Sequence, residues 1–263
     1  MTCVVGDPWF RRRRLVVSAT ATRVRPPFHG GHSAHLWSPP GTVPATWPLI
    51  GGHNGGVKIR SDAELETWVP PHPSASAVLA SVLARYDEPH RHYHDGRHVR
   101  MVVSRCLELM SDASVRVADA HALVWAALWH DAIYDPRAHD NEAASARLAV
   151  EQLGQLGVVT ERLSEVSRLI VLTAGHGVER SDADGAVLVD ADLAVLGASP
   201  DAYADYVRGV RAEYHFVNDD AWRVGRANVL TNLLALPHLF HTPPMLHREA
   251  TARSNLAAEL AQL

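Results

Sequence analysis

The stretch from Ala122 to Trp129 has the sequence ALVWAALW, and His130 and Asp131 follow it directly. It is the longest unbroken apolar run in the 263-residue chain. A helix that is apolar on every face belongs in a protein core, and this run is far shorter than the ~20 residues of a membrane span. We therefore expect no membrane-spanning segment. The His-Asp pair lies at the edge of the core, where a carboxylate needs a cation or several hydrogen-bond donors.

Helical patterns of apolar residues continue on both sides of this stretch. They predict helices over residues 75–86, 98–110, 115–129, 141–156, 160–173, 200–216 and 221–234, and a last helix that begins near His247. No run of alternating strands and no internal repeat is visible in the sequence. Residues 61–263 are therefore predicted to form one all-α domain.

Residues 1–60 differ from the rest of the chain in composition. Eight glycines and seven prolines occupy 15 of these 60 positions, and no apolar period is sustained. This composition favours a disordered extension rich in Gly, Pro and Arg. The run Arg11–Arg14 would also suit a nuclear-localisation or anion-binding patch.

Charge and cysteine content exclude several classes of protein. The first 60 residues carry eight basic residues and one acid, whereas the remaining 203 carry 17 arginines and 28 acids. An acidic body argues against general nucleic-acid binding, because phosphate backbones are bound by basic surfaces. Cys3 and Cys106 are the only cysteines, which excludes a disulfide framework and leads us to expect a reducing, cytoplasmic location.

Three separate segments carry side chains that suit one metal ion. His98 begins a predicted helix, His130 and Asp131 follow the apolar run, and Asp190 and Asp192 lie between apolar residues. Imidazole and carboxylate groups together are a good ligand set for divalent metals, so convergence of these segments would form a site. Taken alone, His130 and Asp131 would favour a helix cap that pairs with an arginine.

Four short motifs extend this pattern along the chain. They are Tyr93-His94 with His98; His130-Asp131 with Tyr134-Asp135-Pro136; Asp140-Asn141-Glu142; and Asp190-Ala191-Asp192-Leu193 with Leu196-Gly197. In this order they resemble the H…HD…D signature of the HD superfamily of metal-dependent phosphohydrolases, and are most similar to a branch of predicted phosphohydrolases. The resemblance covers roughly residues 61–263 and implies an HD-domain-like helical bundle.

The resemblance implies four metal ligands, which are His98, His130, Asp131 and Asp192. It makes Asp190 a supporting or substrate-side group with a role in catalysis. From the residues alone the two late aspartates are interchangeable, because side chains two positions apart in a non-helical segment share a face. His94 is the rival of His98 for the first position, although Gly96 between them makes a regular helical pair less secure.

A single divalent ion is expected, with Mn, Fe, Co, Ni, Zn and Mg all compatible with histidine and carboxylate ligands. Binuclear members of the superfamily need further histidines between the His-Asp doublet and the final aspartate. Only His139 and His176 are available there.

The resemblance also implies catalytic and substrate-binding groups. Glu142 would orient or deprotonate the attacking water, and His176 would act as an acid–base group or phosphate contact. Guanidinium groups suit phosphate oxygens, which makes substrate ligands of Arg97, Arg211 and Arg226. Helix-dipole contacts for the first two residues, and internal ion pairs for the arginines, are the alternatives.

The expected function is hydrolysis of a phosphate ester or phosphoanhydride by metal-activated water. The expected substrate is a small phosphorylated molecule, most often a nucleotide, by analogy with the superfamily. A non-catalytic nucleotide- or metal-binding regulatory module is one alternative. A di-iron oxygenase is the other, but it would need more histidine ligands than this chain offers. The oligomeric state does not follow from the sequence.

Overall fold

The computed structural model describes Ile59 and residues 61–263. All regular secondary structure in this part of the chain is helical, which confirms the predicted all-α class. The predicted disordered extension, residues 1–60, lies outside the described residues except for Ile59.

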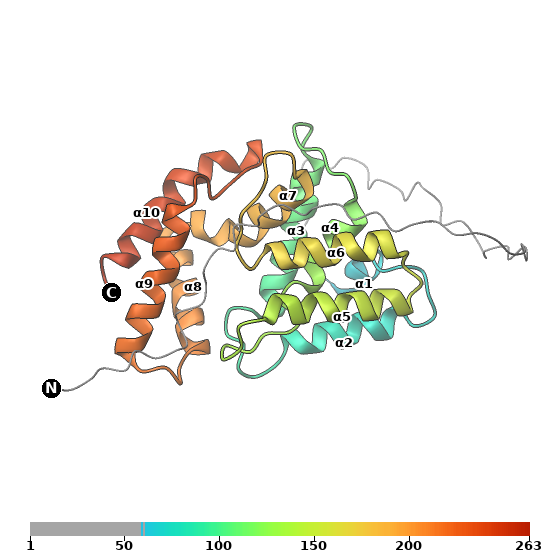
Figure 1. Cartoon of the computed structure of the whole chain (residues 1–263), viewed down its shortest axis with the longest axis horizontal. Helices are drawn as coiled ribbons and strands as arrows, with labels where there is room; N and C mark the ends of the chain where they lie inside the picture. Colours follow the sequence, from blue (N-terminus) through green and yellow to red (C-terminus); the bar gives the residue numbers. More distant parts are fainter. Residues whose placement is uncertain (1–58, 60) are drawn as a thin grey trace, which may run out of the picture.

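The described residues contain ten α-helices and two 3-10 helices, joined by turns and loops (Figure 1). The α-helices are α1 (Asp62–Glu66), α2 (Ala75–Tyr86), α3 (Gly96–Ser111), α4 (Ala120–Trp129), α5 (Asn141–Gln155), α6 (Thr160–Leu172), α7 (Ala183–Asp192), α8 (Pro200–Glu213), α9 (Asp219–Ala235) and α10 (Glu249–Leu260). The 3-10 helices are η2 (Leu193–Gly197) and η3 (Pro243–Arg248). Helices α2, α3, α5, α6 and α9 agree with their predicted ranges to within two residues at each end.

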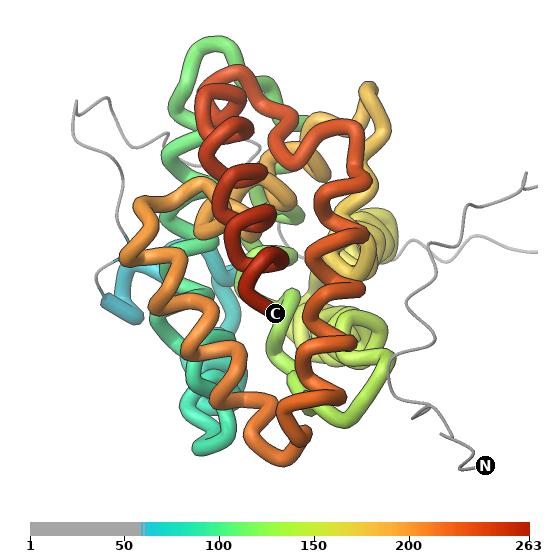
Figure 2. Tube along the Cα trace, turned by 90° about the vertical axis from the view of Figure 1, so that its left-hand side faces the viewer, coloured from blue at the N-terminus to red at the C-terminus, as the bar shows by residue number. Residues whose placement is uncertain are grey.

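The helices form two groups that meet at α7. Helices α1 to α6 occupy one half of the molecule, and α8, α9 and α10 occupy the other (Figure 1). Figure 2 shows α8, α10 and α9 next to one another on their side of the molecule. Helix α7 contacts α3, α4 and α6, and η2 continues from it into contact with α8 and α10. The chain segment that ends at Asp192 therefore joins the two groups.

Helix α4 is the central helix of the first group. It contacts α3, α5, α6 and α7, and every residue from Ala122 to Trp129 is buried, which explains its apolar character on all faces. It begins at Ala120 rather than at residue 115, because the Asp119 side chain accepts hydrogen bonds from the N–H groups of His121 and Ala122. None of the helices in residues 61–263 is long and apolar enough to cross a membrane.

Helix α7 is not among the predicted helices. Its sequence, ADGAVLVDAD, contains a glycine and three aspartates, all of which have low helix propensity. Asp182 caps its first turn by accepting the N–H of Gly185, and Val187, Leu188 and Val189 are completely buried. Tertiary packing therefore sustains a helix that local propensity does not predict.

The core position of α4 predicts a large effect for Leu123→Ala. Leu123 is fully buried, so removing its side chain should lower the free energy of unfolding by ~2–5 kcal/mol. Val224, which is 62% exposed on α9, provides the control. Val224→Ala should change the free energy of unfolding by no more than ~0.5 kcal/mol. Urea unfolding followed by circular dichroism measures both. Equal stability of the two variants would contradict the central position of α4.

Candidate metal centre

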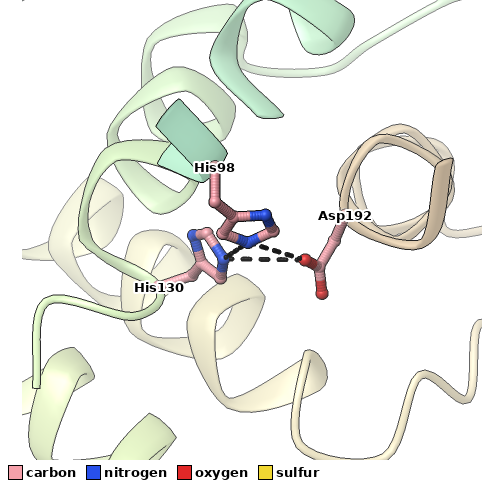
Figure 3. Close-up of side chains that lie close together, drawn as sticks. All are labelled: His98, His130 and Asp192. Atoms are coloured by element: carbon pink, nitrogen blue, oxygen red, sulfur yellow. Dashed lines mark hydrogen bonds and ion pairs between the residues drawn. The ribbon is translucent and has the colours of Figure 1, made fainter. Parts of the chain in front are cut away.

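Three helices bring His98, His130 and Asp192 together. His98 lies in the first turn of α3, and its backbone N–H donates to the side chain of Asp95, the N-cap residue of that helix. His130 directly follows α4, and Asp192 is the last residue of α7. Figure 3 shows the two imidazole rings and the carboxylate pointing toward one another. One ligand atom from each of the three lies within 4.8 Å of the others, a spacing suited to a common metal ion.

Asp131 completes a cluster of four side chains. The Nε2 atoms of His98 and His130 are 3.2 Å apart. Asp192 Oδ1 lies 3.3 Å from His98 Nε2 and 3.7 Å from His130 Nε2. Asp131 Oδ2 lies 3.5 Å from His98 Nε2 and 3.0 Å from His130 Nε2. The structure thus brings together the four predicted ligands, which we call the metal-site cluster.

The turn that carries His130 and Asp131 is fixed by two side chains from elsewhere. The Tyr86 hydroxyl donates to the carbonyl of Leu128, at 3.0 Å. The buried Arg91 guanidinium donates to the carbonyls of Asp131 and Ala132, at 2.8 Å and 3.2 Å. These donors satisfy carbonyl groups that a helix end leaves unpaired, so the turn can lie inside the protein.

The two histidines are oriented differently. His130 Nδ1 donates to the carbonyl of Ala127 at 2.9 Å, which leaves a lone pair on Nε2, the atom that faces the cluster. Such a bond is the usual support of a metal-binding histidine. The Nδ1 atom of His98 is buried and has no hydrogen-bond partner within the described part of the chain, so contacts inside the cluster and ring packing orient this imidazole.

The two carboxylates of the cluster favour a positive charge beside them. Burial lowers the pKa of His98, but hydrogen bonds to Asp131 and Asp192 and their charges outweigh it and raise the pKa to about 10. Burial also raises the pKa of the Asp131 and Asp192 carboxyl groups. The neighbouring histidines outweigh this effect and hold both pKa values below the ordinary value for an aspartate. Two imidazoles with two ionised carboxylates are a donor set that fits a divalent metal ion.

One side of the cluster is accessible. The side chains of His98 and His130 are 2% and 1% exposed, whereas those of Asp131 and Asp192 are each 14% exposed. His176, which is 19% exposed, lies on this side, with Nε2 at 3.2 Å from Asp192 Oδ2. The two carboxylates and His176 are therefore the groups of this site that solvent reaches.

Asp190 lies apart from the metal-site cluster. Segment 183–192 is helical, so the expectation that Asp190 and Asp192 share a face of a non-helical segment is wrong. The Asp190 carboxylate is fully buried and accepts the N–H groups of His241 and Thr242 and the hydroxyl of Thr242, at 2.6 to 2.8 Å. It holds the segment before η3 against α7, and Asp192 alone of the two faces the cluster.

Two of the three predicted phosphate-binding arginines are engaged within the protein. Arg226 is buried and donates to both carboxylate oxygens of Glu259, at 2.7 and 3.0 Å, and to the Tyr206 hydroxyl. Arg211 donates to Asp219 at 2.8 Å and to two backbone carbonyls. Both arrangements match the alternative of internal ion pairs.

The remaining two predicted site residues lie nearer the surface. Arg97 has a side chain that is 84% exposed and donates to Asp95, the cap of α3. Glu142 is half-buried in the first turn of α5 and forms no hydrogen bond or ion pair with the described residues. Their roles in catalysis and substrate binding stay predictions.

A group beside the metal-site cluster was not predicted from the sequence. The buried carboxylate of Glu213, the last residue of α8, binds the side chains of His94 and Tyr134. The available signal was its position in the helix: Glu213 lies three residues after Val210, and both are buried on one helical face. An acid on the apolar face of an amphipathic helix indicates a buried partner.

Protein-family models, curated proteins and solved structures were compared with this chain, and none of them matches it.

The orientation of α7 predicts opposite behaviour for two aspartates two positions apart. Asp192→Asn should reduce bound metal well below one ion per chain, because it removes a charged ligand atom. Asp190→Asn should keep its metal and lose stability, because it weakens the contacts to His241 and Thr242. Elemental analysis after dialysis, together with urea unfolding, distinguishes the two. Metal loss in Asp190→Asn alone would reverse the assignment.

The buried Arg226–Glu259 pair predicts a loss of stability for Arg226→Ala. The change leaves the Glu259 charge buried without its partner, which should cost ~3–5 kcal/mol in free energy of unfolding. The double variant Arg226→Ala/Glu259→Gln removes that charge and should recover part of the loss. Urea unfolding measures both, and wild-type stability of the single variant would contradict a structural role.

Proposed function

We propose that this protein is a metal-dependent phosphohydrolase of the HD superfamily type, which hydrolyses a phosphate ester or phosphoanhydride. The observation that carries the proposal is the convergence of His98, His130, Asp131 and Asp192 from three elements into one cluster with an accessible side. The order of these residues in the chain supports it as well, since it follows the H…HD…D signature.

The metal-site cluster would hold one divalent ion, of Mn, Fe, Co, Ni, Zn or Mg. Such an ion, when bound, lowers the pKa of water and polarises phosphoryl oxygens. The buried histidines would bind it from the protein side, and the accessible carboxylates would leave room for substrate. We assign His176, which contacts Asp192 from that side, the role of acid–base or phosphate contact.

Nucleotides are the proposed substrates, on the strength of the resemblance to the superfamily. Arg211 and Arg226 are left out of the proposed phosphate site because their guanidinium groups have partners within the protein. Arg97 stays in it, since an exposed ion pair such as that with Asp95 is weak enough to exchange for a phosphate. We also propose a cytoplasmic location, which rests on the low cysteine content.

A screen for phosphate release tests the proposed function. The full-length protein, loaded with each divalent metal in turn, should retain about one ion per chain and release phosphate from some nucleotide. Asp131→Ala should lose both the metal and the activity, because it removes a charged group of the metal-site cluster. A wild-type protein that binds metal and nucleotide but never turns it over would instead be a regulatory binding module. Two irons per chain would favour the oxygenase.

His176 has a backbone that allows a clean test of its side chain. Its φ of 55° lies in the left-handed region, where its N–H closes the end of α6 by donating to Leu172. Asparagine tolerates this conformation well, so His176→Asn should fold and keep about one metal ion per chain. Its rate of phosphate release should fall by ~10²-fold or more. A wild-type rate would remove His176 from the proposed site.

A further inference from the structure

Glu213 is a buried carboxylate with five hydrogen-bond donors and no arginine or lysine partner in the described residues. Its Oε1 accepts the backbone N–H groups of His92, Tyr93 and His94 at 2.8 to 2.9 Å. Its Oε2 accepts His94 Nδ1 at 2.7 Å and the Tyr134 hydroxyl at 2.9 Å. Burial raises the pKa of Glu213, but the hydrogen bonds, that with the His94 ring first, outweigh it and lower the pKa to about 2. Glu213 is therefore an ionised acceptor.

An ionised carboxylate can only accept, so Nδ1 of His94 must carry the proton that it shares with Glu213. The second ring nitrogen, Nε2, has no hydrogen-bond partner among the described residues, although Glu213 and its neighbours hold the ring firmly. The ring stacks on Tyr134, with centroids 4.3 Å apart, and meets the edge of Tyr93 at 5.0 Å. A fixed imidazole with one unused nitrogen is typical of a group that binds a ligand.

The His94 ring lies beside the metal-site cluster. Its centroid is 5.5 Å from that of His98, nearly the same separation as the 5.3 Å between His98 and His130. Its positive charge, when present, helps to lower the pKa of Asp131. The His94 side chain is 22% exposed, whereas that of His98 is 2% exposed. His94 is thus a partly exposed ring that packs directly against a buried ring of the cluster.

We propose that His94 binds the phosphoryl group of the substrate through Nε2, and that Glu213 is the positioning residue that holds its ring. The inference rests on the proposed function and names a substrate contact of the same site. An imidazole nitrogen suits a phosphoryl group in either protonation state, since it accepts from P–OH or donates to P–O⁻. Glu213 ends α8, so this contact also ties the C-terminal helices to the site.

Glu213→Gln tests the positioning role without removing the hydrogen bonds to the backbone. The amide oxygen can still accept the N–H groups of His92, Tyr93 and His94, but an amide NH₂ now faces His94 Nδ1. The imidazole must then accept at Nδ1 and carry its proton on Nε2, the opposite tautomer. Nitrogen chemical shifts of the His94 ring report this exchange of tautomers directly, and a purely structural role of Glu213 would not produce it.

The decisive experiment measures the affinity of the full-length, metal-loaded protein for inorganic phosphate by calorimetry. His94→Ala should weaken binding by about 10-fold or more at unchanged metal content, the effect of losing a hydrogen bond to a charged group. Glu213→Gln, which changes Nε2 from an acceptor to a donor, should alter the affinity when His94 is present and leave it unaltered in the His94→Ala background. The double variant should bind no more weakly than His94→Ala, because both changes act through one ring. Glu259→Gln, which alters the other buried carboxylate of the C-terminal helices, should bind phosphate as the wild type does.

Wild-type phosphate affinity in His94→Ala would overturn the inference while leaving the proposed hydrolase intact. Additive losses in the double variant would overturn the positioning role of Glu213. A wild-type protein that keeps its metal but neither binds phosphate nor releases it from nucleotides would refute the proposed function, and the inference with it.

Discussion

Helix α4 ends inside the protein, so its last carbonyl groups and the two ionisable side chains that follow must find partners away from bulk water. The Tyr86 hydroxyl and the Arg91 guanidinium satisfy the carbonyls. His130 and Asp131 join His98 and Asp192, two residues from other helices. An isolated carboxylate at this position would be very costly, and the cluster offsets that cost by mixing anionic and cationic or metal-binding groups. The cluster therefore depends on the packing of α3 and α7 against α4.

Three buried acids hold the C-terminal helices to one another and to the rest of the protein. Asp190 of α7 binds the backbone of residues 241 and 242, Glu259 of α10 binds Arg226 of α9, and Glu213 of α8 binds the loop that carries His94. Each acid has several donors, as buried carboxylates require. Asp190 joins the C-terminal segment to α7 and Glu213 joins α8 to the loop beside the cluster, whereas Glu259 joins α10 to α9. Helices far from the cluster in sequence thus become part of its surroundings.

Several of these features could be predicted from local sequence, and others could not. The apolar period and the capping residues located α2, α5, α6 and α9, because those signals act within one or two turns. The same signals missed α7, whose glycine and aspartates oppose helix formation until packing stabilises it. That omission left Asp190 and Asp192 indistinguishable. Arg226 was ambiguous for a related reason, since its partner Glu259 lies 33 residues later on a different helix.

The sequence by itself predicted that residues 61–263 are helical, that one helix is central, and that His98, His130, Asp131 and one of Asp190 and Asp192 have the chemistry of metal ligands. These properties depend on residue type and on spacing within a few turns. Only the tertiary structure decided which aspartate faces the cluster, which arginines are already paired, and that Glu213 holds His94 beside it. Those outcomes depend on contacts between residues up to 121 positions apart, and such contacts exist only once the helices have packed.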